Sequence, residues 1–496
     1  MLKSLLIANR GEIACRIIRS CKKLGIRSIA AYSEADADAL HVRMADESIK
    51  IGGPVASDSY LRIKRLVSAA KKMNADAVHP GYGFLSENPE FVQALNNEGI
   101  GFVGPSAEII RDMGDKIQAR KLAKEAGVPV VPGTEGEMSD SEAMVEAQRI
   151  GFPIMVKAAD GGGGMGIRSV ENQGQLLASM AQARTQAENS FGSSRVYLEK
   201  RIDGASHVEV QVLADKHGNA VHLFERDCST QRRNQKVLEE TPCGKLDDKT
   251  RQALLESAVN LTKSIGYQNA GTVEYLLAPN GSFYFLEMNT RLQVEHPITE
   301  MVTGLDIVEL QLRIASGEEL PFKQEDVKSK GAAIEVRIYP EDPETLLPTY
   351  GVVSDLIEPT GENVRVDGAL YVGYEVLPYY ESLMSKLIVW AEDRPRAIEE
   401  MRKAIAAYKI QGVVTNQPLL DRILIQPKFE QSRYDTHFLE NLITETASAG
   451  SGKEIIAAIA LAMAIAQDRD RASQPSKWKM HGRRQSMVGR LSGGMN

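Results

Sequence analysis

Paired cysteines are missing from this sequence of 496 residues, because its four cysteines form no Cys-x-x-Cys motif. A zinc site or a disulfide framework is therefore not indicated. An excess of basic charge is also missing: the formal net charge is −7, which disfavours nonspecific nucleic-acid binding. No stretch approaches the roughly 20 apolar residues that span a bilayer, and the N-terminal apolar run is too short for a signal peptide. We therefore expect a cytoplasmic protein without a membrane span.

What the chain contains is typical of a globular protein, with 43% hydrophobic and 25% charged residues and a length of roughly three domains. Strand and helix patterns alternate over the first hundred residues, which predicts a parallel sheet covered by helices. From Gly331 a strand-rich region follows, ending in a helix over 394–408. The expected fold class is α/β, with an N-terminal Rossmann-like parallel-sheet domain, a central domain and a C-terminal mixed β-rich domain.

One segment near residue 290 alternates polar and apolar side chains. In an extended chain the polar members would share one face, where they could bind a divalent cation and small anions. An edge strand with one solvated face gives the same alternation and is the alternative. The apolar run 283–286 before it and Pro297 after it favour a buried strand that enters a cleft. The polar members are Glu287, Asn289, Arg291, Gln293 and Glu295.

Three of the oxygen-bearing side chains are predicted to form a magnesium site. Asn280-Gly281 is a hairpin signal that would bring Glu274 and Glu287 side by side on neighbouring strands. Adjacent carboxylates repel unless a cation lies between them, and Mg²⁺ prefers oxygen ligands. Asn289 offers a further oxygen on the same face. The alternative is a cross-strand pair of solvated glutamates.

A glycine run at 161–164 with Gly166 formally matches Gly-x-Gly-x-x-Gly. A dinucleotide site needs strand, loop and helix in that order, whereas a second strand is predicted here. Glycines in a hairpin loop let backbone N–H groups approach phosphates, and the ammonium of Lys157 on the preceding strand could reach the same phosphates. A flexible loop without a ligand is the alternative.

A charged run extends from Glu225 to Lys236. Taken by itself, such a run is typical of a solvated loop. Beside a phosphate-transfer site, its cations become candidates for holding anions.

Together these motifs resemble biotin carboxylase, a family of the ATP-grasp superfamily. The resemblance covers about residues 1–442. It implies an N-terminal domain at 1–113, an ATP-grasp domain at 114–330 with a mobile lid near 130–203, a C-terminal domain at 331–445 and a tail at 446–496. The matching stretches are 7–14, 79–88, 113–116, Lys157 with the glycine loop, 225–229, 287–297 and 378–383.

The resemblance implies a two-step reaction. Bicarbonate attacks the γ-phosphate of ATP, with Mg²⁺ or Mn²⁺ bound, to give carboxyphosphate, and the CO2 released from it is captured by biotin. No Ala-Met-Lys-Met biotin-attachment sequence is present, so we expect the biotin on a separate carrier. The implied partners are a biotin carboxyl carrier protein, a carboxyltransferase subunit and a second copy in a homodimer. The final acceptor, such as acetyl-CoA, propionyl-CoA or pyruvate, is not indicated.

Carried over by position, the resemblance assigns roles to individual residues. Glu295 would be the general base for bicarbonate, and Arg337 would stabilise the biotin oxyanion. Bicarbonate would be held by Lys236, Arg291, Gln293 and Val294. Magnesium would be held by Glu274, Glu287 and Asn289. Tyr82 would line the biotin site, and the nucleotide would be bound by Lys116, Lys157, Gly163, Gly164, Glu199, Lys200, Ile202, His207, Gln231 and Leu276.

Three positions depart from the family pattern. Met165 replaces the usual Arg or Lys of the glycine loop, Asn234 replaces a usual His, and Glu381 replaces a usual Asp. The first two put nucleotide affinity in doubt. Two rival hypotheses stay open. One is another ATP-grasp ligase, which activates a carboxylate for attack by an amine. The other is a nucleotide-binding scaffold without catalysis, which only Met165 and Asn234 support.

The tail differs from the rest of the chain, with an Ala/Ile-rich helix pattern at 454–466 followed by a basic segment at 469–490. A frayed tail is one interpretation. A docking segment for a partner subunit is the other, because a lone apolar helix face must be buried somewhere.

Overall fold

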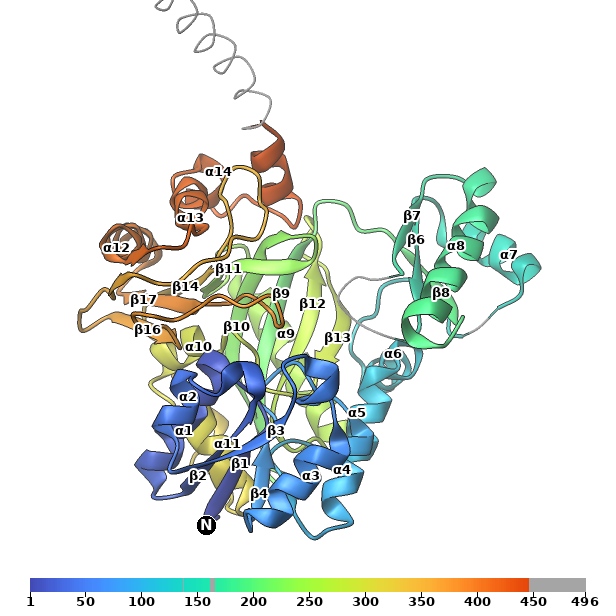
Figure 1. Cartoon of the computed structure of the whole chain (residues 1–496). Coiled ribbons are helices and arrows are strands. Elements are labelled where there is room, and N and C mark those ends of the chain that lie inside the picture. The colour runs from blue at the N-terminus through green and yellow to red at the C-terminus, as the bar shows by residue number, and fades with distance from the viewer. Residues whose placement is uncertain (137, 161–165, 446–496) are drawn as a thin grey trace, which may run out of the picture. The chain divides into compact units, whose positions relative to one another are not determined.

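The computed structural model describes residues 1–136, 138–160 and 166–445. Its N-terminal part is the predicted parallel sheet, with strand order β3-β2-β1-β4-β5. Helices cover this sheet, shown in blue in Figure 1. The elements are β1 (Ser4–Ile7), α1 (Gly11–Leu24), β2 (Arg27–Ser33), η1 (Glu34–Asp36), α2 (Leu40–Met44), β3 (Glu47–Gly52), η2 (Ala56–Asp58), α3 (Ile63–Lys72), β4 (Ala77–His79), α4 (Pro89–Asn96), β5 (Gly101–Phe102) and α5 (Ala107–Gly114).

The apolar β1 explains why this sheet is buried on both faces. Leu5 and Ile7 pack into a core with α1, while Leu6 packs on the other side with residues of α3 and α4. The loop after β4 is fixed by Asn9, whose Nδ2 donates to the carbonyl oxygens of Pro80 and Tyr82, each at 2.7 Å. Tyr82 therefore lies at the carboxyl ends of the strands, where open α/β sheets place ligands.

A separate antiparallel sheet of three strands, in the order β7-β6-β8, follows in the chain. Helices α7 and α8 pack with it around a small core (Figure 1). The strand–loop–strand order predicted around the glycine run is confirmed, although residues 161–165 lie outside the described residues. The elements are α6 (Lys116–Glu125), α7 (Asp140–Ile150), β6 (Ile154–Ala158), β7 (Arg168–Val170), α8 (Gln173–Phe191) and β8 (Val196–Lys200).

The largest sheet has eight strands in the order β13-β12-β9-β10-β11-β14-β17-β16. It runs across the predicted domain boundary at 330, because β11 pairs directly with β14. Its strands are β9 (Ser206–Ala214), β10 (Ala220–Arg232), β11 (Gln235–Thr241), β12 (Asn269–Leu277), β13 (Phe283–Asn289), β14 (Ala332–Ile338), β16 (Val364–Gly368) and β17 (Ser385–Ala391).

Helices flank this sheet, and α9 contacts β9 and β10 while α12 contacts β14 and β17. The chain up to residue 439 forms one compact unit, and the predicted docking tail at 446–496 lies outside the described residues. The remaining elements are α9 (Asp248–Ser264), α10 (His296–Thr303), α11 (Ile307–Ala315), η3 (Gln324–Asp326), β15 (Asp355–Ile357), α12 (Arg394–Ala407), β18 (Lys409–Gln411), α13 (Gln417–Leu424) and α14 (Pro427–Glu430).

The expected extended row near residue 290 is wrong beyond Asn289, where β13 ends. Glu295 is instead the N-cap residue of α10, and Pro297 lies in the first turn of that helix. Proline fits there because the first turn needs no N–H donor from it. The row of five side chains on one strand face is therefore replaced by a strand end, a loop and a helix start.

The charged run at 225–236 is not a solvated loop, because all of it except the turn residues Arg233 and Asn234 belongs to β10 and β11. Arg226 and Asp227 are buried, with 0% and 1% exposure. The charge of Arg226 is compensated by Glu209 on β9, and that of Asp227 by Lys245 in the turn before α9. Local composition could not reveal these partners.

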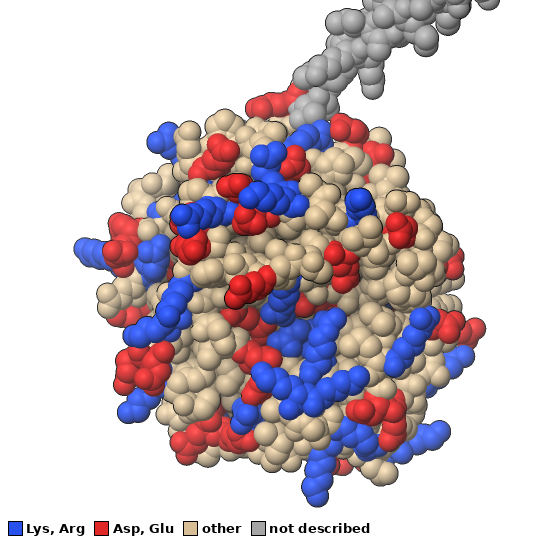
Figure 2. All heavy atoms as spheres, turned by 90° about the vertical axis from the view of Figure 1, so that its left-hand side faces the viewer, with Lys and Arg blue, Asp and Glu red and all other residues tan. Residues whose placement is uncertain are grey.

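The surface carries both signs of charge. Figure 2 shows Lys and Arg side chains interspersed with Asp and Glu on the face that lies at the left of Figure 1. Among the described residues, no helix is both long enough and apolar enough to cross a membrane.

Candidate functional site

The ammonium of Lys236 on β11 lies among three carboxylates. Its Nζ donates to Glu209 at 2.5 Å, to Glu295 at 2.6 Å and to Glu274 at 3.0 Å. An ammonium has three N–H donors, so these acceptors satisfy it completely. The three glutamates come from β9, the start of α10 and β12, which meet at this point.

Glu295 is held between two cations. Its Oε1 accepts from Lys236, and its Oε2 accepts from Arg337 at 3.0 Å. Burial by itself would raise the pKa of Glu295, but Lys236, Arg337 and Arg226 outweigh burial and hold this pKa well below its usual range. The direction of this shift favours an ionised Glu295 carboxylate, although the side chain is buried.

Arg337 on β14 is fixed from its other side by Glu239, whose Oε1 accepts from Nε at 2.7 Å. Glu239 lies directly opposite Glu335 in the ladder between β11 and β14, and both side chains are fully buried. Burial raises the pKa of Glu239 to about 7 even though Arg337 opposes the shift. Burial likewise raises the pKa of Glu335 well above its ordinary value.

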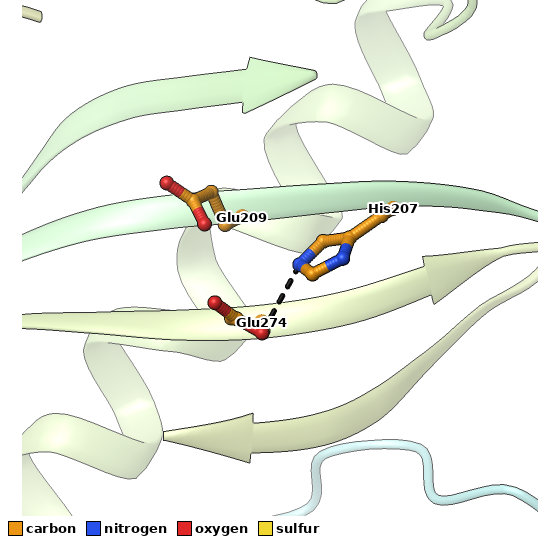
Figure 3. Close-up of side chains that lie close together, drawn as sticks. All are labelled: His207, Glu209 and Glu274. Carbon is orange, nitrogen blue, oxygen red and sulfur yellow. Dashed lines mark ion pairs between the residues drawn. The ribbon is translucent and has the colours of Figure 1, made fainter. Parts of the chain in front are cut away.

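Figure 3 shows His207 and Glu209 from β9 beside Glu274 from β12. His207 Nε2 lies 3.1 Å from Glu274 Oε2. Burial by itself would lower the pKa of His207 and raise the pKa of Glu274, because it disfavours the charged form of each. The carboxylate nevertheless raises the pKa of His207, while Lys236 and His207 lower the pKa of Glu274. Ligand atoms of these three residues lie within 4.8 Å of one another, but Lys236 already neutralises part of their charge.

The three predicted magnesium ligands lie on adjacent strands. Glu274 is the ladder partner of Glu287, and Asn289 follows two residues later on β13. The predicted β-hairpin between the strands is confirmed, with Gly281 at φ +83°. Glu287 is half-buried, and Lys116 Nζ lies 3.5 Å from its Oε2. Carboxylate and amide oxygens are the donors that Mg²⁺ prefers, so these residues fit the ion.

The loop from residue 290 to 294 is held from both sides. Arg291 donates through Nε to Glu87 at 2.8 Å and through its NH2 group to Asn289 at 2.8 Å. Gln293 accepts from Arg291 at 2.9 Å and donates to Glu274 at 3.1 Å. The Val294 carbonyl accepts from Lys386 Nζ at 2.7 Å. These contacts place two amides, a guanidinium and a backbone turn beside the Lys236 cluster.

The residues predicted to bind the nucleotide fall into two groups. On the three-stranded sheet, Lys157 Nζ lies 2.5 Å from Glu199 Oε2, and Arg120 also pairs with Glu199. Lys200 donates to the carbonyls of Gly151 and Phe152, each at 2.9 Å. On the large sheet lie His207, Gln231, which is the ladder partner of Lys236, and Leu276.

The other predicted residues have their own surroundings. Tyr82 donates its hydroxyl to Glu12, and burial raises the pKa of this tyrosine well above its usual value. Ile202 follows β8 in the chain. Gly163 and Gly164, together with Met165, lie outside the described residues.

Several charged residues of the site were missed from the sequence. They are Glu12, Glu87, Glu209, Glu239 and Lys386, of which four are almost fully buried. Arg226 donates to Glu209 Oε1 at 2.5 Å and to Gln211 at 2.8 Å. The alternation of His207, Glu209 and Gln211 along β9 is a signal of the same kind as the row near residue 290, and could have revealed this strand face.

Comparison with protein families gives three consecutive matches. A model of the biotin carboxylase N-terminal domain matches residues 1–110. A model of the ATP-binding domain of the carbamoyl-phosphate synthase L chain matches residues 115–323. A model of the biotin carboxylase C-terminal domain matches residues 335–441.

Whole-chain comparisons agree with these matches. A biotin carboxylase of Halalkalibacterium halodurans is 48% identical over 442 residues, which cover 89% of this chain and 98% of the relative. The structure of a biotin carboxylase complex with β,γ-ATP from Campylobacter jejuni has a TM-score of 0.87 at 47% identity, covering 89% and 99% of the two chains.

A second similar structure is the biotin carboxylase domain dimer of Hydrogenobacter thermophilus 2-oxoglutarate carboxylase, in complex with MgADP, ADP and bicarbonate. Its TM-score is 0.85 at 46% identity, with coverage of 89% of this chain and 98% of that one. Both the sequence and the fold therefore match over nearly the full length of these proteins. The chain belongs to the biotin carboxylase family.

Proposed function

We propose that this protein carboxylates biotin with bicarbonate at the expense of ATP, through carboxyphosphate. The relatives named above are biotin carboxylases, and one similar structure holds MgADP and bicarbonate. The observation that carries the proposal is the buried Glu295 carboxylate between Lys236 and Arg337. This arrangement offers a base and two cations within one cluster, as the activation of a small anion requires.

For the first step, we infer that Lys236, Arg291, Gln293 and Val294 hold bicarbonate and that Glu295 removes its proton. Bicarbonate is a poor nucleophile, so its orientation toward the phosphate matters. A carboxylate with a strongly lowered pKa is a weak base. A bicarbonate charge bound beside Lys236 would offset part of the positive charge that lowers the pKa of Glu295, and so would raise this pKa toward the value that proton removal needs.

For the nucleotide, Glu274, Glu287 and Asn289 would hold Mg²⁺, which neutralises phosphate charge when bound. Lys116 lies beside Glu287, so it is placed to contact the same phosphates. Lys157, Glu199, Lys200 and Ile202 would bind the nucleotide from the three-stranded sheet. Closure of the segment near 130–203 as a lid stays a prediction, motivated by the need to keep water from carboxyphosphate.

For the second step, we infer that Arg337 stabilises the negative oxygen of biotin and that Tyr82 lines the biotin site. Arg337 is fixed by Glu239 and Glu295, so its guanidinium needs little reorganisation when charge develops. Biotin is proposed to arrive on a separate carrier protein, with a carboxyltransferase subunit as the next partner. A homodimer is proposed in line with the dimer of the similar Hydrogenobacter structure.

The test is ADP release from the full chain with ATP and Mg²⁺, with and without bicarbonate and with and without free biotin. We expect turnover that needs bicarbonate and rises with biotin. Stimulation by an amine in place of biotin would favour an amide-forming ligase of the same superfamily. ATP binding without bicarbonate-dependent turnover would indicate a scaffold that lacks catalysis.

A further inference from the structure

A buried ion pair joins two distant parts of the chain beside the site. Glu12 lies in the first turn of α1, and Lys386 is the second residue of β17. Lys386 Nζ is 3.2 Å from Glu12 Oε1, and the two side chains are 0% and 2% exposed. The proposed reaction steps use neither residue.

Each member of the pair also holds one substrate-binding segment. Lys386 Nζ donates to the carbonyl of Val294 at 2.7 Å, in the loop proposed to hold bicarbonate. Glu12 Oε1 accepts from the hydroxyl of Tyr82, in the loop proposed to line the biotin site. One ammonium and one carboxylate therefore connect the two loops.

The strand register links the same lysine to the biotin oxyanion site. Lys386 is the ladder partner of Arg337 on β14 and of Asp367 on β16. Directly opposite residues of neighbouring strands point to the same face of the sheet. Lys386 thus lies between the guanidinium proposed to contact biotin and the loop proposed to contact bicarbonate.

Stability alone is a poor reason for this pair. Removing both charges from water is costly, and apolar replacements of buried ion pairs are often equally stable. In the part of the chain that the structure describes, the second oxygen of Glu12 has no hydrogen-bond partner although it is buried. The pair is therefore not optimised for hydrogen bonding, while both of its outward contacts lead to substrate loops.

We propose that Glu12 and Lys386 are positioning residues that hold the Val294 carbonyl and the Tyr82 hydroxyl in a fixed relation, so that bicarbonate and biotin bind in the correct mutual geometry. The inference rests on the proposed function and adds that the bicarbonate loop and the biotin loop must be held together. Small displacements of reacting groups cost large factors in rate, so a fixed link between the two loops matters for the transfer of CO2.

The test compares the full wild-type chain with Lys386→Met, Glu12→Gln and the double variant. ADP release is measured while ATP, bicarbonate and free biotin are varied in turn. Because a charge-assisted hydrogen bond is lost, we expect KM for bicarbonate and for biotin to rise about tenfold in Lys386→Met and in the double variant. The KM for ATP should stay within about twofold, since no nucleotide contact is touched.

The double variant separates positioning from charge compensation within the pair, because both of its members become neutral. Normal KM values for bicarbonate and biotin in this variant would overturn the proposal. If Lys386→Met does not fold, the neutral double variant carries the test. A wild-type chain without bicarbonate-dependent ADP release would instead refute the proposed function itself, and the inference with it.

A matched control is Arg394→Met, which breaks another ion pair, between the half-buried Arg394 and the buried Glu240 at 2.7 Å. The hydrogen bonds of Arg394 go to Glu240, Phe429 and Glu430, which lie outside the proposed substrate-binding set. We expect a lower melting temperature and unchanged KM values. Equal KM changes in this control would mean that general loosening explains the effect, and would also overturn the proposal.

Discussion

At the scale of single residues, the site is a set of buried charges that neutralise one another. Lys236 and Arg337 both contact Glu295, and each has a second carboxylate partner, Glu209 and Glu239 respectively. A bound anion must compete with these carboxylates for the same cations. With bicarbonate bound as proposed, these contacts would tune how tightly it binds.

Glu295→Gln keeps the size of the side chain and removes the proposed base. We expect bicarbonate-dependent ADP release to fall by at least about 100-fold, the usual contribution of a general base. Nucleotide binding, measured by calorimetry, should persist because no proposed nucleotide contact is changed. The surface variant Glu98→Gln serves as the control, since Glu98 pairs with Lys71 at the surface, away from the site. Retained turnover in Glu295→Gln would remove Glu295 from the role of base.

Arg337→Ala removes the guanidinium proposed to stabilise the biotin oxyanion. Stimulation of ADP release by biotin should be lost, while ATP binding remains. The variant leaves Glu239 and Glu295 without this partner, so thermal melting must be recorded alongside activity. Normal stimulation by biotin in a folded variant would show that Arg337 does not act on biotin.

At the scale of elements, sequence patterns predicted the pieces that depend on local signals. The hairpin at Asn280-Gly281 and the alternation of β1 to β5 follow from turn chemistry and hydrophobic periodicity. The strand row beyond Asn289 and the exposure of the 225–236 run could not be predicted. There the outcome depends on partners such as Glu209 for Arg226, which long-range strand pairing supplies.

The loop after β4 gives a prediction at this scale. Gly81 and Gly83 both have positive φ, at +63° and +67°, so alanine is strained at either position. A Cβ at Gly81 would also lie 2.8 Å from Asn9 Nδ2, whereas a Cβ at Gly83 meets nothing within 4 Å. We expect Gly83→Ala to lower the free energy of unfolding by about 1 kcal/mol and Gly81→Ala by about 1 kcal/mol more. Urea titration measures both, and equal losses would contradict the contact with Asn9.

At the scale of the whole molecule, the buried acids make stability depend on pH. The pKa of Glu239 is about 7 in the folded chain and lies near its ordinary value of 4.5 when unfolded. Between these values the folded state binds more protons than the unfolded state, so this group lowers stability as pH rises from about 4.5 to about 7. Glu274 and Glu295 have lowered pKa values, so ionisation of these groups stabilises the folded state. This contribution to stability is lost as the pH falls and the two carboxylates become protonated.

Glu239→Gln should remove the part of the pH dependence of stability that comes from Glu239. We expect the variant to lose less unfolding free energy than the wild type between pH 5 and about 7, because its amide does not titrate. Denaturant titrations at several pH values measure this slope. Glu98→Gln, at the surface, should leave the slope unchanged. Parallel curves for Glu239→Gln and the wild type would show that Glu239 is ionised throughout this range.

The pairing of β11 with β14 has a consequence for protein engineering. A chain cut near residue 330 would expose the backbone donors and acceptors along β11, and such unpaired edges recruit other strands and promote aggregation. Chimeras that exchange the C-terminal third with a related enzyme must therefore preserve the packing of side chains between β11 and β14. The parts of the chain before and after residue 330 are expected to fold together, because they share one sheet. A truncated chain that ends near residue 330 is expected to precipitate.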